Sequence, residues 1–139
     1  MLNIADNGIG NKGLAILSKV KFINLHYLNL ENNNLTSKCI SSLNQLITNE
    51  GTIMDLRLGK NNLEDNCIIE LSYSLFKASC KLKRLDLDQN PISEVGLNSI
   101  FESLVNNQCL EHLNLEECTK VGISDKKRIQ FLSLMLLTN

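Results

Sequence analysis

A pattern of apolar residues and asparagine recurs at a nearly constant interval along this 139-residue chain, and this repetition constrains the fold most strongly. The copies begin at Leu25, Ile53, Leu82 and Leu110, so they are 28, 29 and 28 residues apart. Each reads apolar-x-x-Leu-x-Leu-x-x-Asn or Cys, and an incomplete copy occupies residues 2–9. A fixed period of about 20 to 50 residues is typical of a solenoid, in which one structural unit stacks on the next.

Each copy contains two hydrophobic periods in succession. The Leu-x-Leu core alternates at period two, which predicts a short strand whose leucines are buried and whose intervening residues face outward. Apolar residues three and four positions apart follow each core, as at Ile68, Leu71 and Leu75. This spacing predicts a helix with one buried face. We therefore expect an α/β fold with strands in one layer and helices in the other.

The consensus Leu-x-x-Leu-x-Leu-x-x-Asn/Cys-x-Leu resembles the leucine-rich repeat family over essentially the whole chain. The 28- and 29-residue periods are similar to its ribonuclease-inhibitor type. The resemblance implies a horseshoe segment, with a parallel β-sheet on the concave side and α-helices on the convex side. It also implies that the asparagine of each copy, such as Asn33, hydrogen-bonds the backbone of neighbouring coils, and that Cys118 takes this place in the last copy.

This register predicts one domain, 1–139, of about five repeats: a partial repeat at 1–24, then 25–52, 53–81, 82–109 and 110–139. We expect a C-terminal capping helix in the last repeat rather than a membrane-surface helix, because the end of a solenoid needs closure. At the other end Met1 stands almost within the first strand. We therefore expect a longer repeat array or, as a second choice, self-association through the uncapped N-terminal edge.

Composition excludes several classes of function. The net charge of −1 argues against nucleic-acid binding, and no apolar run approaches the roughly 20 residues that span a bilayer. Few aromatic residues, 4%, argue against an aromatic ligand cavity. The N-terminus lacks the features of a secretory signal, which favours a cytoplasmic location. We expect no cofactor, no metal and no catalytic residue.

The five cysteines fit the repeat register as small buried apolar residues. Cys39 and Cys67 fall in a small-residue position at the start of a helix, and Cys118 falls in the asparagine position. Cys80 and Cys109 share a position just before a strand, so a disulfide between adjacent coils is a minor alternative. An odd number of cysteines without a signal sequence favours reduced thiols.

The segment Asp6–Gly13 contains a formal Gly-x-Gly-x-x-Gly, which on its own suggests a nucleotide-binding loop. The repeat register offers a simpler explanation, because Asn7 takes the asparagine position and Ile9 the next apolar position. A dinucleotide site would also need an acidic residue about 20 positions later. The sequence there, Asn24-Leu25-His26, contains none.

The outward strand residues are the candidate binding site, because the core does not use them. They form three rows across neighbouring strands, about 4.8 Å apart. The sequence predicts opposite-sign pairs between Asp55 and Arg84 and between Arg57 and Asp86, and an acidic, unpaired third row. We expect Tyr27 and Arg84 to anchor a protein partner with a basic patch. The rows contain Tyr27, Asp55, Arg84 and His112; Asn29, Arg57, Asp86 and Asn114; and Glu31, Asp88 and Glu116, with Gly59 completing the third.

The leading hypothesis for function is a non-enzymatic module that binds a protein partner through the concave face. The resemblance extends to repeats in ribonuclease inhibitors, in nucleotide-binding immune receptors and in bacterial effectors that act in a host cytosol. An alternative is a GTPase-activating or regulatory protein that acts on a small GTPase, with Arg57 or Arg84 as a charged contact. A structural spacer is a third possibility.

Overall fold

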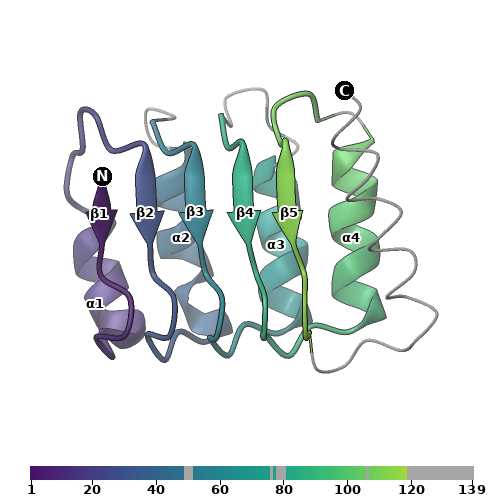
Figure 1. Cartoon of the computed structure of the whole chain (residues 1–139), viewed down its shortest axis with the longest axis horizontal. Coiled ribbons are helices and arrows are strands. Elements are labelled where there is room, and N and C mark those ends of the chain that lie inside the picture. The colour runs from purple at the N-terminus through teal and green to yellow at the C-terminus, as the bar shows by residue number, and fades with distance from the viewer. Residues whose placement is uncertain (49–51, 76, 78–80, 106, 119–139) are drawn as a thin grey trace.

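The computed structural model describes residues 1–48, 52–75, 77, 81–105 and 107–118, in which short strands alternate with helices (Figure 1). The expected capping helix falls within 119–139, outside these residues. The elements are β1 (Leu2–Asn3), α1 (Gly10–Leu17), β2 (Tyr27–Asn29), the 3-10 turn η1 (Ser37–Cys39), α2 (Ile40–Thr48), β3 (Asp55–Arg57), α3 (Asp65–Leu75), β4 (Arg84–Asp86), α4 (Glu94–Leu104) and β5 (His112–Asn114).

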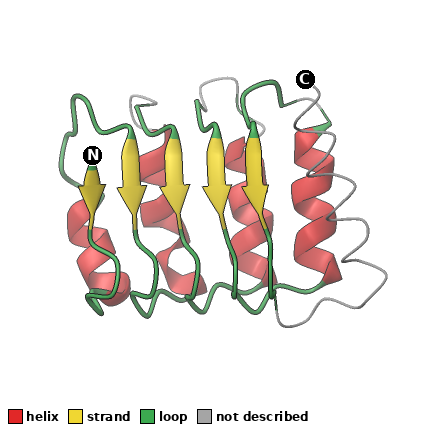
Figure 2. Cartoon of the chain, viewed as in Figure 1, coloured by secondary structure: helices red, strands yellow, loops and turns green. Residues whose placement is uncertain are grey.

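The strands form one parallel sheet in the order β1-β2-β3-β4-β5, and the helices form a second layer behind it (Figure 2). Each strand pairs with the next in the register that the leucine spacing predicts. The equivalent residues are Leu2, Leu28, Leu56, Leu85 and Leu113. The predicted α/β solenoid is therefore confirmed.

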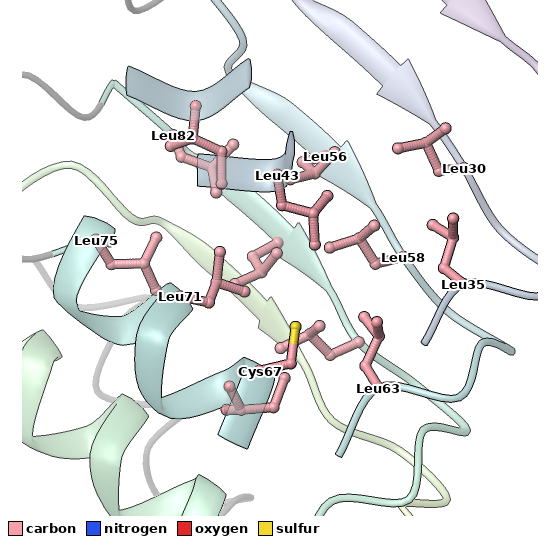
Figure 3. Close-up of a cluster of buried hydrophobic side chains, with 14 of the residues drawn as sticks. Leu30, Leu35, Leu43, Leu56, Leu58, Leu63, Cys67, Leu71, Leu75 and Leu82 are labelled. Carbon is pink, nitrogen blue, oxygen red and sulfur yellow. The ribbon is translucent and has the colours of Figure 1, made fainter. Parts of the chain in front are cut away.

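The core lies between the two layers and consists almost entirely of leucine and isoleucine (Figure 3). Leu56 and Leu58 of one coil are fully buried, and Leu43 of α2 and Leu71 of α3 extend into the same core from the helix layer. The shared 28- to 29-residue period stacks the same side chains on one another in every coil. Burial of each leucine contributes about 1.5–3 kcal/mol, so the stacked leucines are the main stabilising feature.

Asparagine side chains connect successive coils through the backbone. Asn61 Oδ1 accepts hydrogen bonds from the backbone N–H groups of Asn33 (3.0 Å) and Leu35 (2.9 Å) in the preceding coil. Its Nδ2 donates to the carbonyls of Leu30, Leu58 and Gly59, each at 3.0 Å. Backbone groups that would otherwise be buried without partners are thus satisfied.

The same arrangement recurs along the chain and ends at a weaker link. Asn33 and Asn90 are fully buried, and each also contacts the preceding coil. Asn33 Oδ1 accepts from the amides of Asn7 and Ile9, and Asn90 Oδ1 accepts from that of Leu63. Their Nδ2 groups donate to the carbonyls of Ile4 and Leu58. In the last described coil Cys118 occupies this position, as the sequence predicts. Its Sγ donates a long bond of 3.7 Å to the Leu87 carbonyl. A thiol is a weaker hydrogen-bonding group than a carboxamide.

The glycine-rich segment near the N-terminus is part of this series of asparagine–backbone hydrogen bonds between coils, here called the asparagine ladder. The backbone N–H groups of Asn7 and Ile9 both donate to Asn33 Oδ1 at 3.2 Å, and Gly10 N donates to the Asn33 carbonyl at 2.9 Å. Amides that would have to point at a phosphate therefore already have partners within the protein. The interpretation of this segment as repeat structure, not as a nucleotide loop, agrees with these contacts.

The cysteines divide into two groups. Cys39, Cys67 and Cys118 are buried with free thiols, as predicted. Cys39 and Cys67 lie at equivalent positions of adjacent coils, and a hydrogen bond between the thiols lowers the pKa of Cys39 and raises that of Cys67. Cys109 is exposed, so its expected burial was wrong. Cys80, its suggested disulfide partner, lies outside the described residues.

Candidate protein-binding face of the sheet

The face of the sheet opposite the helices, here called the open face, carries the outward strand residues. Parallel pairing places Tyr27 beside Asp55, Asp55 beside Arg84 and Arg84 beside His112, which forms the first predicted row. Arg84, His112 and Glu116 are exposed, and most other members of the rows are partly exposed. The sequence therefore placed these residues correctly along the sheet, although the contacts among them differ from the prediction in several places.

Asn29 departs from the expectation because only 6% of its surface is exposed. Its Oδ1 accepts a hydrogen bond from the backbone N–H of Glu31 at 2.9 Å. Asp86 and Asn114 hold the N–H groups two residues later in the same way, at 3.2 and 3.1 Å. These side chains form Asx turns that end the strands. The second row therefore has a structural role that the sequence analysis missed, although its recurring Asn or Asp was a visible signal.

A charged cluster occupies the centre of the open face. Asp55 accepts a hydrogen bond from Arg57 Nε at 3.4 Å and forms an ion pair with Arg84, whose Nε lies 3.6 Å from Asp55 Oδ2. The pair with Arg84 is the predicted one. Arg57 lies beside Asp86 in the predicted register, but its ion pair is with Asp55.

The guanidinium of Arg57 also lies over the ring of Tyr27, 5.3 Å from its centroid. Such a cation–π contact contributes about 0.5–1 kcal/mol at an exposed site. One carboxylate thus orients two guanidinium groups and, through one of them, an aromatic ring. The contacts restrict the rotamers of these side chains before any partner arrives.

The third row is acidic, but the expectation that it is unpaired was wrong in one place. Lys60 Nζ donates to Glu31 Oε1 at 2.5 Å, and this hydrogen bond raises the pKa of Lys60. Lys60 reaches Glu31 because its own backbone adopts a left-handed conformation with φ 54°. The corresponding position of other coils also has positive φ, at Asp6, Asn32, Gln89 and Glu117.

Asp88 has an unusual environment because its neighbour in the preceding coil, Gly59 just after β3, has no side chain. A Cβ atom at Gly59 would lie only 1.7 Å from Asp88 Oδ1, so the carboxyl group of Asp88 occupies the space above the glycine. Partial burial there, a hydrogen bond with Asp86 and the negative charges of Asp86 and Glu31 raise the pKa of Asp88 to about 6. Lys60 acts in the opposite direction.

A shallow depression of about 300 Å³ lies over β4 and β5. Basic, acidic and imidazole side chains line it together, from Arg57, Arg84, Asp86, His112 and Glu116. Its small volume and open form suit protein side chains better than an enclosed small-molecule ligand. Within the part of the chain that the structure describes, no group of three or more His, Cys, Asp or Glu residues could hold a metal ion. Of the described helices, none has the length and apolarity needed to cross a membrane.

Comparisons with known proteins agree with this architecture. A family model described as Leucine Rich Repeat matches residues 24–46, and a second of the same description matches 2–18 and 78–101. The rat "NACHT, LRR and PYD domains-containing protein 3" is 33% identical over 117 residues, which is 82% of this chain. Its human counterpart is 32% identical over the same share. The human "NACHT, LRR and PYD domains-containing protein 14" is 31% identical over 83% of the chain.

The chain spans only about a tenth of the length of these relatives, 10–11%. The similarity therefore concerns the repeats and not the relatives as whole proteins. Repeat spacing, strand register, the asparagine ladder and the family models all lead to one assignment. The chain belongs to the leucine-rich repeat family.

Proposed function

We propose that the chain is a non-enzymatic interaction module whose open face binds a protein partner that carries basic residues. Leucine-rich repeats are typically protein-interaction modules, which supports the general class. The observation that carries the proposal is the cluster of Tyr27, Arg57, Asp55 and Arg84, whose outward side chains hold one another in place. Tyrosine and arginine are the residue types that most often dominate binding energy at interfaces.

The acidic groups beside this cluster favour a basic partner. Asp86, Asp88 and Glu116 lie on neighbouring strands β4 and β5 or directly after them. Repulsion from Asp86 contributes to the raised pKa of Asp88, so negative charge is held there at a cost. A lysine or arginine from a partner would relieve this repulsion, and the electrostatic attraction would also speed association.

Quantitative capture from a lysate tests the proposal. The immobilised chain is compared with a triple variant of the open face, Tyr27→Ala, Arg84→Ala and Glu116→Ala. A matched control, Val105→Ala, Lys77→Ala and Glu64→Ala, changes one apolar, one basic and one acidic residue away from the open face, and all three are exposed. We expect a partner that the control retains and the open-face variant loses, and we expect salt to weaken its binding. Equal capture by both variants would favour a spacer or another surface.

The structure gives less support to the alternative of a GTPase-activating protein. A catalytic arginine would have to extend toward a nucleotide, whereas both Arg57 and Arg84 are held by Asp55 on the sheet. A turnover assay with candidate small GTPases tests this alternative directly.

We further propose the ribonuclease-inhibitor type of repeat and a cytosolic location. The 28- to 29-residue period supports the first, as do the α-helices of 8, 9, 11 and 11 residues that alternate with the strands. The free buried thiols of Cys39, Cys67 and Cys118 fit a reducing compartment. A role as an effector delivered into a host cytosol stays a prediction from composition, and contact through the β1 edge stays a prediction from the sequence.

A further inference from the structure

Among the residues that the structure describes, the helix side carries opposite charges at its two ends. Within residues 10–48 the sequence contains a single acidic residue, Glu31, which lies on the open face. Four exposed lysines lie on or beside α1 and η1 in this half, namely Lys12, Lys19, Lys21 and Lys38. The half formed by α3 and α4 carries acidic residues instead: Glu64, Asp65, Glu70, Glu94 and Glu102. Lys77, beyond the end of α3, is a basic residue among the described residues of this half.

The basic end presents an apolar side chain between two lysines. Lys12 and Ile16 are four residues apart and lie on one face of α1, and Lys19 lies in the turn that follows the helix. All three are exposed, Ile16 to 69%, whereas Leu14 on the opposite face is fully buried. The two lysines form no ion pair with any other described residue. A large exposed aliphatic side chain flanked by cations is a suitable contact for an apolar depression with an anionic rim.

The acidic end contains such a depression. A hollow of about 300 Å³ lies between α3 and α4 and is lined by Ser72, Tyr73, Ser99, Glu102 and Ser103. Tyr73 is 64% exposed, so its ring forms an accessible wall. Glu102 stands at the hollow and Glu70 lies one turn before Tyr73 on α3; both are exposed. Among the described residues neither glutamate has an ion-pair partner.

From this complementarity we infer that the helix side binds a second copy of the chain, with α1 of each copy against the α3–α4 hollow of the other. The helices α1 and α4 lie at opposite ends of the layer (Figure 1). A two-fold axis through the middle of the layer, near α2, would place the basic end of each copy against the acidic end of the other. Such a contact is isologous and closed, so it produces a dimer and not a filament.

The expected dimer is weak and sensitive to salt. A standard interface takes about 800 Å² from each partner, roughly a tenth of this chain's 7667 Å² of accessible surface. The outward residues of α2 between the two ends, Ser41, Gln45 and Thr48, carry no charge. Affinity therefore depends on the apolar contact of Ile16 and on exposed ion pairs, which screening weakens.

Sedimentation equilibrium of the 139-residue chain tests the inference at 50 and 500 mM NaCl. We expect a monomer–dimer equilibrium at the lower salt concentration and about tenfold weaker association at the higher one. Two variants reverse the charge of one end each: Lys12→Glu with Lys19→Glu, and Glu70→Lys with Glu102→Lys. Each variant alone should lose self-association, because both of its ends then carry the same sign.

An equimolar mixture of the two variants should associate again, because every contact of the mixed dimer pairs opposite charges. The control Lys81→Glu with Lys83→Glu makes the same charge change near the strands and should leave dimerisation unchanged. Circular dichroism confirms that each variant is folded. A wild-type chain that stays monomeric at 50 mM NaCl, variants that associate like the wild type, or a mixture that stays monomeric would overturn the inference. Association that resists both reversals would place the contact elsewhere, such as at β1.

Discussion

Replacement of Asp88 by asparagine should stabilise the protein at neutral pH and leave its stability nearly unchanged in acid. Asparagine has almost the same shape as aspartic acid and fits the space above Gly59, but it carries no charge. The pKa of Asp88 is raised to about 6 by partial burial, by a hydrogen bond with Asp86 and by neighbouring negative charges. The folded protein therefore holds the charged form of this side chain at a cost in free energy.

The difference between the folded pKa of about 6 and the ordinary value of 3.8 sets the size of the effect. Two pKa units correspond to about 3 kcal/mol. Because the side chain keeps contact with water, screening reduces the expected effect to about 1 kcal/mol. Between pH 3.8 and about 6 the folded state binds more protons than the unfolded state, so the wild-type free energy of unfolding falls as the pH rises through this interval.

Urea unfolding at pH 4.5 and 7.5, followed by circular dichroism, measures this difference. The free energy of unfolding of the Asp88→Asn variant should exceed that of the wild type by about 1 kcal/mol at pH 7.5 and by much less at pH 4.5. Glu116→Gln is the control, because it removes a carboxylate from the same row without a contact like that above Gly59. An equal gain at both pH values, or a loss at pH 7.5, would refute this account of Asp88.

Three further predictions concern the ladder and the thiols. Asn61→Ala leaves the buried N–H groups of Asn33 and Leu35 without an acceptor. It should lower the free energy of unfolding, measured by urea titration, by about 3 kcal/mol or more. The control Asn62→Ala, at an exposed position, should change this free energy little. Cys118→Asn should complete the ladder and raise the melting temperature through a gain of about 1 kcal/mol; a lower melting temperature would argue against equivalence of this position. An alkylating reagent should modify Cys109 in the native protein well before Cys39, Cys67 or Cys118, as followed by peptide mass spectrometry.

The fold could be predicted from the sequence because leucine spacing maps directly onto geometry. An interval of 28 or 29 residues fixes which strand residues are neighbours, so the pairing of Leu28, Leu56 and Leu85 followed from counting. The ladder was expected from the resemblance to leucine-rich repeats, in which the recurring asparagine, or Cys118 in the last copy, stands at the turn where backbone groups need partners. Burial of these residues leaves little choice of conformation.

The open face was predictable in position but not in detail. Register places Asp86 beside Arg57, yet the arginine has two carboxylates within reach and forms its ion pair with Asp55. Lys60 turns toward Glu31 because of a left-handed backbone at its own position, which the spacing of leucines does not reveal. Long charged side chains choose among neighbours about 4.8 Å apart, and that choice depends on local backbone geometry.

The direction of the asparagine contacts has a consequence for how the molecule opens. Each carboxamide oxygen accepts one or two backbone amides from the coil before it, so each of these coils relies on its successor for hydrogen bonds of its turn. The coil of Asn90 relies on a thiol and therefore has the weakest support of the series. Hydrogen exchange should accordingly be faster at the Asn90 amide than at the amides of Asn33 and Leu35, so that the turns open first where a thiol replaces the carboxamide.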